Sequence, residues 1–163
     1  MVQPISSRVV ELLNDALTFE LTVTNTYFLH ARMLDNWGLG RLGKVFYDVS
    51  IDEMKDADEL ISRILMFDGH PNVQKLNPIT VGESAEEMLR LAFDSEKAAV
   101  AQFNTSAQAC HELGDHGTAA VFEEMVRDEE KHADWFESQL DAIERVGTQQ
   151  YLAQQMPAGE GPS

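Results

Sequence analysis

One spacing, repeated in both halves of the chain, constrains the fold more than any other feature of the sequence. In each half a glutamate lies 33 residues before a second glutamate, and another ligand-type residue follows three positions later. The six residues are Glu20, Glu53 and Asp56 in the first half, and Glu96, Glu129 and His132 in the second. This layout, with a lone carboxylate on one helix and a ligand pair on the next, is typical of four-helix bundles that bind two metal ions. The one departure is Asp56, where such bundles have histidine.

The composition fits one globular domain of 163 residues. Hydrophobic residues make up 44% of the chain and charged residues 25%, which is ordinary for a protein with a buried core. The net charge of −16 argues against nucleic acid or an anionic membrane as a partner. The acidity favours attraction of cations, although solubility alone also accounts for it. We expect one domain with a dinuclear metal site over residues 1–156 and a disordered tail over residues 157–163.

Cysteine content and the ends of the chain indicate a cytoplasmic protein. The single cysteine, Cys110, excludes an internal disulfide and fits a reducing compartment. The first residues, MVQPISSRVV, lack the basic and apolar regions of a signal peptide. No run approaches the roughly 18 apolar residues of a membrane span.

Apolar residues recur at steps of three and four along four long stretches, which predicts an all-α protein. Ser6 and Ser7 can cap the first helix, and Ser84-Ala-Glu-Glu87 is a capping box for the third. We expect helices at about Arg8–Asp35, Leu39–Phe67, Ser84–Gly114 and Gly117–Gly147, with a short fifth helix at Gln149–Met156.

The connections between these helices predict the topology. The breaks after the first and third helices are short, so each is antiparallel to the helix that follows. The segment Asp68–Glu83 is far longer than a bundle loop needs. Its sixteen residues reach about 54 Å when extended, whereas a helix of 28 residues is only about 42 Å long. It can therefore start the third helix parallel to the second, and one long crossover of this kind is the connectivity of ferritin-like folds.

The predicted ligands interrupt stripes that are otherwise mostly apolar. Burying an ionised carboxylate without a partner costs several kcal/mol, so six converging polar groups require a positive charge between them. Oxygen-rich ligation with little imidazole suits iron or manganese better than zinc or copper. A single E-x-x-H step is common by chance. Four stripes with equal spacings are not, and they indicate a dinuclear metal centre.

Three stretches of the sequence resemble the bacterioferritins, the haem-containing ferritins, and the resemblance covers nearly the whole chain. The stretches are ELTVTNTYFLHARMLDNWGL, SIDEMKDADELISRIL and RDEEKHADWFESQL. The resemblance implies a closed shell of about 24 identical subunits, or a shell mixed with a second bacterioferritin subunit. It also implies that the protein oxidises Fe²⁺ with dioxygen or peroxide and stores the ferric product as a mineral. Haem b would lie at the two-fold interfaces.

The resemblance also assigns roles to individual residues. Glu20 and Glu96 resemble the terminal iron ligands, and His132 resembles the imidazole ligand of the second iron. Glu53 and Glu129 resemble the bridging carboxylates. Asp56 lies where the family has its other histidine. Tyr27 resembles a catalytic tyrosine beside the centre, and the alternative is a core tyrosine whose hydroxyl is satisfied.

Met54 resembles the family's haem ligand, and two symmetry-related Met54 sulfur atoms would hold one haem iron. Met54 lies about 100° around its helix from Glu53, so it cannot share the metal-facing stripe. It belongs to a second stripe with Tyr47 and Ile51, and Phe28 lies on a similar stripe of the first helix. Apolar residues on two faces of a helix indicate a subunit contact. On spacing alone Met54 is ordinary interface packing.

Other titratable residues are not assigned to the metal centre. Asp48 and Asp52 lie one helical turn apart, and they either collect iron on a cavity surface or form a solvated acidic face. The remaining histidines show no partner pattern, and we interpret them as structural or exposed. These residues are His30, His70, His111 and His116.

The favoured function is iron storage with ferroxidase activity. The first alternative is a haem-carrying structural subunit of a mixed shell, with an iron centre weakened by Asp56. The second is a small di-iron oxidase that stores nothing, and a shell-sized particle on gel filtration would exclude it.

Overall fold

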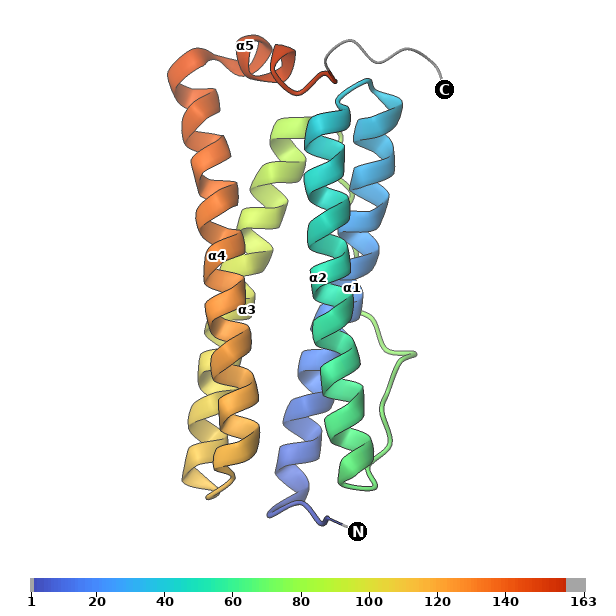
Figure 1. Ribbon diagram of the computed structural model, residues 1–163, viewed down its shortest axis with the longest axis vertical. Helices are drawn as coiled ribbons and strands as arrows, with labels where there is room; N and C mark the ends of the chain where they lie inside the picture. Colours follow the sequence, from blue (N-terminus) through green and yellow to red (C-terminus); the bar gives the residue numbers. More distant parts are fainter. Residues whose placement is uncertain (1, 158–163) are drawn as a thin grey trace.

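The computed structural model describes residues 2–157, which form four long helices and one short helix (Figure 1). The helices are α1 (Ser7–Asn36), α2 (Gly40–Met66), α3 (Ala85–Glu112), α4 (His116–Val146) and α5 (Thr148–Ala153). The all-α prediction is confirmed, and the ends of the long helices agree with the predicted ones to within two residues. The fifth helix ends earlier than expected. Six of the seven residues of the predicted tail, 158–163, lie outside the described residues. Within residues 2–157, none of the helices combines the length and apolar character needed to cross a membrane.

Polar side chains cap the starts of three helices. Ser6 accepts a hydrogen bond from the first turn of α1, as predicted. Ser84 Oγ accepts from the backbone N–H of Glu87 at 3.1 Å, which confirms this half of the capping box. Asp115 Oδ1 accepts from the backbone N–H of Thr118 at 2.9 Å. This cap was not predicted, and it starts α4 at His116.

A long crossover joins α2 to α3 and runs beside α1 (Figure 1). It returns the chain to the other end of the bundle, so that α3 runs parallel to α2, as the length of the segment predicted. Three α1 side chains, eight residues apart, accept hydrogen bonds from its backbone. The pairs are Asn72 N to Asn14 Oδ1 at 2.8 Å, Asn77 N to Thr22 Oγ1 at 2.9 Å and Gly82 N to His30 Nε2 at 3.0 Å.

The apolar core consists of two clusters separated by the middle of the bundle. One surrounds Phe103 and Phe122, and the other surrounds Tyr27, Phe46 and Phe136. On every long helix, residues of one cluster precede the predicted ligand glutamate and residues of the other follow it. Burial of each large side chain stabilises the fold by about 1.5–3 kcal/mol. The two clusters therefore hold the four glutamates in a polar layer with apolar packing on both sides.

The short helix α5 covers one end of the bundle (Figure 1). Its Tyr151 is buried in the same cluster as Phe46. The Tyr151 hydroxyl donates a hydrogen bond to Gln139 Oε1 at 2.9 Å. Gly147, with φ of 87°, makes the turn from α4 into α5, a conformation that favours glycine.

Candidate metal centre

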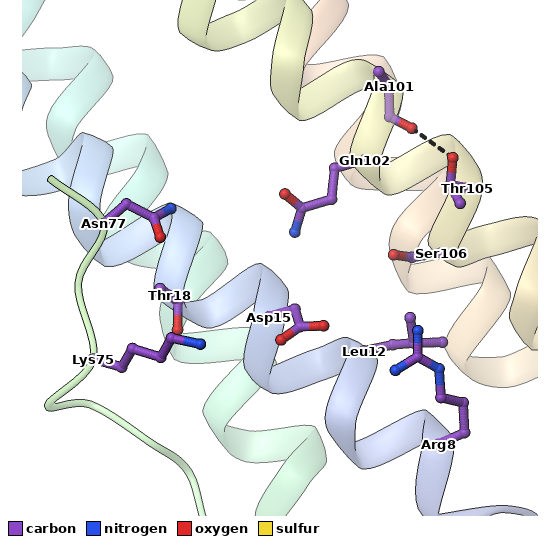
Figure 2. Close-up of a pocket in the computed structure, with 10 residues that line it drawn as sticks. All are labelled: Arg8, Leu12, Asp15, Thr18, Lys75, Asn77, Ala101, Gln102, Thr105 and Ser106. Carbon is purple, nitrogen blue, oxygen red and sulfur yellow. Dashed lines mark hydrogen bonds between the residues drawn. The ribbon is translucent and has the colours of Figure 1, made fainter.

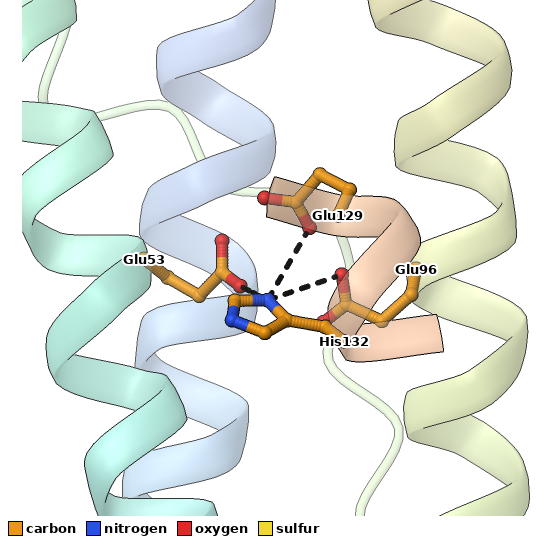
Figure 3. A group of neighbouring side chains, drawn as sticks. All are labelled: Glu53, Glu96, Glu129 and His132. Atoms are coloured by element: carbon orange, nitrogen blue, oxygen red, sulfur yellow. Dashed lines mark ion pairs between the residues drawn. The ribbon is translucent and has the colours of Figure 1, made fainter. Parts of the chain in front are cut away.

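The six predicted ligands lie together in the polar layer. Their side chains form two groups, and within each group one ligand atom from every residue lies within 4.8 Å of the others. One group is Glu53, Glu96, Glu129 and His132 (Figure 3), and the other is Glu20, Glu53, Asp56 and Glu129. The two groups share Glu53 and Glu129 and no other residue. A pair of carboxylates common to two adjacent sites is the arrangement that bridging ligands require.

The burial of the glutamates fits a site for cations. Each long helix contributes one glutamate, and all four side chains are at most 1% exposed. Both carboxylate oxygens of Glu20, Glu53 and Glu129, and one of Glu96, are buried without a hydrogen-bond partner. Buried polar atoms are normally hydrogen-bonded. Ion-pair contacts with His132 reach three of these oxygens, one each of Glu53, Glu96 and Glu129. The other four have neither kind of partner, which points to ligands that the side chains of this chain do not supply.

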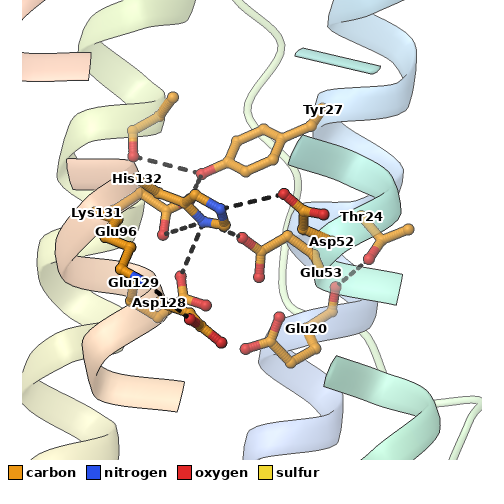
Figure 4. A network of polar contacts seen from close by, with 11 residues as sticks. Glu20, Thr24, Tyr27, Asp52, Glu53, Glu96, Asp128, Glu129, Lys131 and His132 are labelled. Carbon is orange, nitrogen blue, oxygen red and sulfur yellow. Dashed lines mark hydrogen bonds and ion pairs between the residues drawn. The ribbon is translucent and has the colours of Figure 1, made fainter. Parts of the chain in front are cut away.

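His132 lies at the centre of the cluster (Figures 3 and 4). Its Nδ1 is 2.8 Å from Glu53 Oε1, 3.8 Å from Glu96 Oε2 and 3.9 Å from Glu129 Oε2. Burial tends to lower the pKa of His132, but hydrogen bonding and charge from Glu129, Glu53 and Glu96 outweigh it and raise that pKa well above its ordinary value. The imidazolium is a cation held where a metal ion would lie.

The crowding of carboxyl groups shifts their pKa values. Burial, followed by the charge of Glu53, raises the pKa of Glu20 well above its ordinary value. Burial and a hydrogen bond with Glu96 raise the pKa of Glu129 to about 11. Burial and the charges of Glu53 and Asp128 raise the pKa of Asp56 to about 7. Like charges at short range disfavour ionisation, so protons neutralise part of this site.

Tyr27 lies against the ligand group that contains Glu96 and His132 (Figure 4). Its side chain is 1% exposed, and its hydroxyl donates a hydrogen bond to Glu96 Oε1 at 2.7 Å. Burial and the charge of Glu96 raise the pKa of this phenol well above its ordinary value. The hydroxyl therefore has a hydrogen-bond partner, as expected of a core tyrosine. That partner, Glu96, is a predicted metal ligand. Tyr27 orients Glu96.

A pocket between α2 and α4 opens beside the centre, and two of its acidic side chains, Asp52 and Asp128, were not predicted as part of the site. Asp52 Oδ2 lies 3.5 Å from His132 Nε2 (Figure 4). The sequence pattern placed Asp52 with Asp48 on a solvated or cavity-facing surface. Periodicity along one helix cannot find this contact, because it joins two helices. The pocket is lined by Asp52, Lys55, Asp56, Asp128, Lys131 and His132.

Met54 faces away from the carboxylates. It is 48% exposed, and so is Phe28 of α1. The ring centroids of Phe28 and Tyr47 lie 6.1 Å apart, and the Arg32 guanidinium lies over both rings at 5.7 Å and 5.1 Å. The predicted second stripe is thus an exposed apolar and aromatic face on α1 and α2. A thioether sulfur on such a face has the chemistry of an axial haem ligand.

A second pocket lies between α1, the crossover and α3 (Figure 2). Its lining includes the charged residues Arg8, Asp15 and Lys75, together with amide and hydroxyl side chains. None of its lining residues belongs to either ligand group. The sequence did not predict this pocket, and its mixed charges show no ligand pattern.

Comparison with known proteins identifies the family of the chain. The chain matches the ferritin-like domain over residues 10–146. A bacterioferritin of Brucella melitensis is 42% identical over 144 residues, covering 88% of this chain and 89% of the relative. A bacterioferritin of Rhodobacter capsulatus is 39% identical over 143 residues, covering 88% and 89%. One of Streptomyces coelicolor is 40% identical over 158 residues, covering 94% and 95%. The chain therefore belongs to the bacterioferritin family.

Proposed function

We propose that this protein stores iron and oxidises Fe²⁺ at the carboxylate layer between its four helices. Its membership of the bacterioferritin family supports iron storage. One observation carries the ferroxidase proposal: two groups of buried ligand atoms share Glu53 and Glu129. Two Fe²⁺ ions bound this way lie on either side of the shared carboxylates, with Glu20 and Asp56 on one and Glu96 and His132 on the other. Carboxylate oxygens and a single imidazole are a suitable donor set for iron.

The side chains contribute charge, position and protons to this reaction. Glu20 and Glu129, whose pKa values are raised, release their protons when Fe²⁺ binds. Tyr27 keeps Glu96 oriented through its hydrogen bond. Each Fe²⁺ loses one electron, so two Fe²⁺ and two protons reduce dioxygen to peroxide, or reduce peroxide to two water molecules. The apolar clusters on both sides restrict water around the buried ligands.

The pocket beside His132 provides a path for Fe²⁺ to reach the buried ligands. Asp52, Asp56 and Asp128 line it, and their carboxylates attract cations. Among the ligands, Asp56 and His132 are only partly buried, and they lie on this side of the centre. Iron therefore passes the aspartates before it meets the fully buried glutamates.

Stopped-flow oxidation tests the ferroxidase proposal. The unmodified protein is expected to show a fast phase that saturates near two Fe²⁺ per subunit, one for each ligand group. Glu129→Ala removes a shared ligand and is expected to abolish this phase. Glu130→Ala, which changes an exposed neighbour, is the matched control and keeps it. Equal fast phases in the two variants would exclude the carboxylate layer as the oxidation site.

We also propose that subunits assemble into a closed homo-oligomer of about 24 copies, with haem b between pairs of subunits. The exposed face of Phe28 and Met54 supports a contact on this side of α1 and α2, because soluble monomers avoid large apolar patches. Two Met54 sulfur atoms, one from each subunit, would ligate the haem iron. Light scattering tests the assembly, and a monodisperse monomer at micromolar concentration would contradict it.

Two exposed methionines of α2, Met54 and Met66, allow a matched test of the haem site. Met54→Leu is expected to leave the shell assembled but abolish haem absorption. Met66→Leu changes another exposed methionine of α2, 42% exposed against 48% for Met54, and keeps normal haem uptake. Normal haem uptake by Met54→Leu would remove Met54 from the site.

One observation favours a second function: Asp56 replaces an imidazole that the centre would otherwise have. A haem-carrying structural subunit in a mixed shell needs no fast oxidation of its own. The two functions differ in the stopped-flow result for the pure protein. An assembled, haem-loaded protein without any fast phase would favour the structural subunit.

A further inference from the structure

Three side chains outside the carboxylate layer meet at the turn between α3 and α4. His111 lies in the last turn of α3, His116 is the first residue of α4, and Glu123 lies two turns further along α4. The Nδ1 atoms of the two histidines are 3.0 Å apart, and His111 Nε2 contacts Glu123 Oε1. The turn lies at the end of the bundle opposite α5 (Figure 1). This cluster is therefore separate from the iron ligands.

The contact with Glu123 fixes the proton on His111. A carboxylate only accepts hydrogen bonds, so His111 donates from Nε2–H, and in the neutral imidazole its Nδ1 carries a lone pair. That lone pair faces Nδ1 of His116. Histidines that bind metals commonly donate their other ring N–H to a carboxylate, which fixes the tautomer and increases the basicity of the ligand atom. His111 and Glu123 already have this arrangement.

We propose that His111 and His116 bind a divalent transition-metal ion of the imidazole-preferring class, such as Zn²⁺, through their Nδ1 atoms. A tetrahedral ion about 2.1 Å from both nitrogens separates them by about 3.4 Å. The observed 3.0 Å needs a change of only a few tenths of an ångström. Binding through Nδ1 requires His116 to carry its ring proton on Nε2.

Solvent completes the coordination of this ion. The side chains of His111 and Glu123 are 44% and 47% exposed, which leaves room for water on the outer side. Two imidazoles favour zinc, copper or nickel over the hard cations that all-oxygen sites bind. The donor set therefore differs in kind from the oxygen-rich centre inside the bundle.

Zinc binding to the assembled protein tests the site. Calorimetric titration with Zn²⁺ is expected to give one more bound ion per subunit in the unmodified protein than in His116→Ala. The side chain of Asp115 caps α4 by accepting from the backbone N–H of Thr118, so this variant keeps the helix start. His70→Ala, which changes an exposed histidine of the crossover, is the control and keeps the full stoichiometry. Glu123→Gln removes the charge that supports His111, and it weakens zinc binding about tenfold.

Crystals soaked in Zn²⁺, with data collected at the zinc absorption edge, locate the ion. The expected result is an anomalous peak between the two Nδ1 atoms that disappears in His116→Ala, while any zinc in the carboxylate layer remains. Equal zinc stoichiometry in His116→Ala and the unmodified protein would overturn the proposal. So would a map without a peak at these two atoms. Neither result depends on iron oxidation, so the zinc site and the ferroxidase centre are tested separately.

Discussion

The α1–α2 pair and the α3–α4 pair face the metal centre with different chemistry. The first pair supplies Glu20, Glu53 and Asp56, so its ligand atoms are all carboxylate oxygens. The second pair supplies two glutamates and the imidazole of His132. The first pair also has a buried histidine, His30, but this side chain accepts a hydrogen bond from the backbone of the crossover at Gly82.

The two buried histidines, His30 and His132, show how neighbouring carboxylates decide the charge of a buried imidazole. Burial lowers the pKa of His30 to about 4, because no carboxylate compensates fully for the lost hydration. Burial acts in the same direction on His132, but Glu129, Glu53 and Glu96 raise its pKa well above the ordinary value. One residue type is therefore a neutral hydrogen-bond acceptor in the first pair and a cation in the second. Protons on Glu20 and Asp56 reduce the negative charge of the first half of the centre, as the positive charge of His132 does in the second half.

Removing His132 is the most severe test of this asymmetry. His132→Ala deletes the only imidazole of the centre and leaves the second site with carboxylates alone. The fast phase of Fe²⁺ oxidation is expected to fall by about a hundredfold or more, measured by stopped-flow absorbance. Glu130→Ala, an exposed neighbour that does not line the pocket beside the centre, is the control. A fast phase of normal rate in His132→Ala would show that the two halves do not differ in the way proposed.

Asp56→Ala tests the weaker half. The carboxylate at this position is shorter than histidine and is expected to hold the first iron loosely, so its loss should slow the fast phase by about tenfold. The affinity for one of the two Fe²⁺ ions should fall in parallel, as measured by anaerobic titration. Asp58→Ala alters an exposed aspartate of the same helix and serves as the control. Unchanged binding and oxidation in Asp56→Ala would make Asp56 a bystander.

The pKa of His30 predicts a pH-dependent stability. The folded protein binds fewer protons at His30 than the unfolded chain, whose histidines have a pKa near 6.5. Stability is therefore full above about pH 6.5 and decreases as the pH falls towards 4. Between pH 7.5 and 5.5 this loss is about 1 kcal/mol per subunit. In urea unfolding His30→Gln should show a flatter pH profile than the unmodified protein. His70→Gln should keep the original profile, and identical profiles for all three proteins would contradict the prediction.

Asp56→His is expected to have the smallest effect and to make the two halves alike. An imidazole at this position restores the ligand that the arrangement of the centre implies, and it should tighten the first site. Oxidation should become faster by a few-fold in the stopped-flow assay. A slower reaction would indicate that the all-oxygen half is adapted to aspartate.

Much of the fold could be predicted because its signals are local. Ser6 and Ser84 mark helix starts through side-chain caps that depend on a few neighbouring residues. The long crossover follows from the length of one segment. The glutamates of the centre follow from equal spacings, since helices of similar length place equivalent residues at the same height.

The remaining contacts depend on how the helices pack. Asp52 meets His132 across two helices, and His30 meets the backbone of Gly82 in the crossover. No periodicity along one helix encodes these pairs. The same is true of Glu123, which reaches His111 only because the turn between α3 and α4 closes tightly. These contacts between elements could be identified only from the three-dimensional structure.

The crossover also has a consequence for engineering. Three contacts with α1 divide this connection into short loops, and exposed Lys75 lies in the loop between Asn72 and Asn77. The entropic cost of closing a loop grows only slowly with the number of its residues, and doubling its length costs only about 0.6 kcal/mol. A peptide inserted at Lys75 therefore lengthens one short loop, while the outer contacts, at Asn14 and His30, keep the rest of the crossover in place. This position suits the display of foreign peptides, because the four helices and their ligands stay in register.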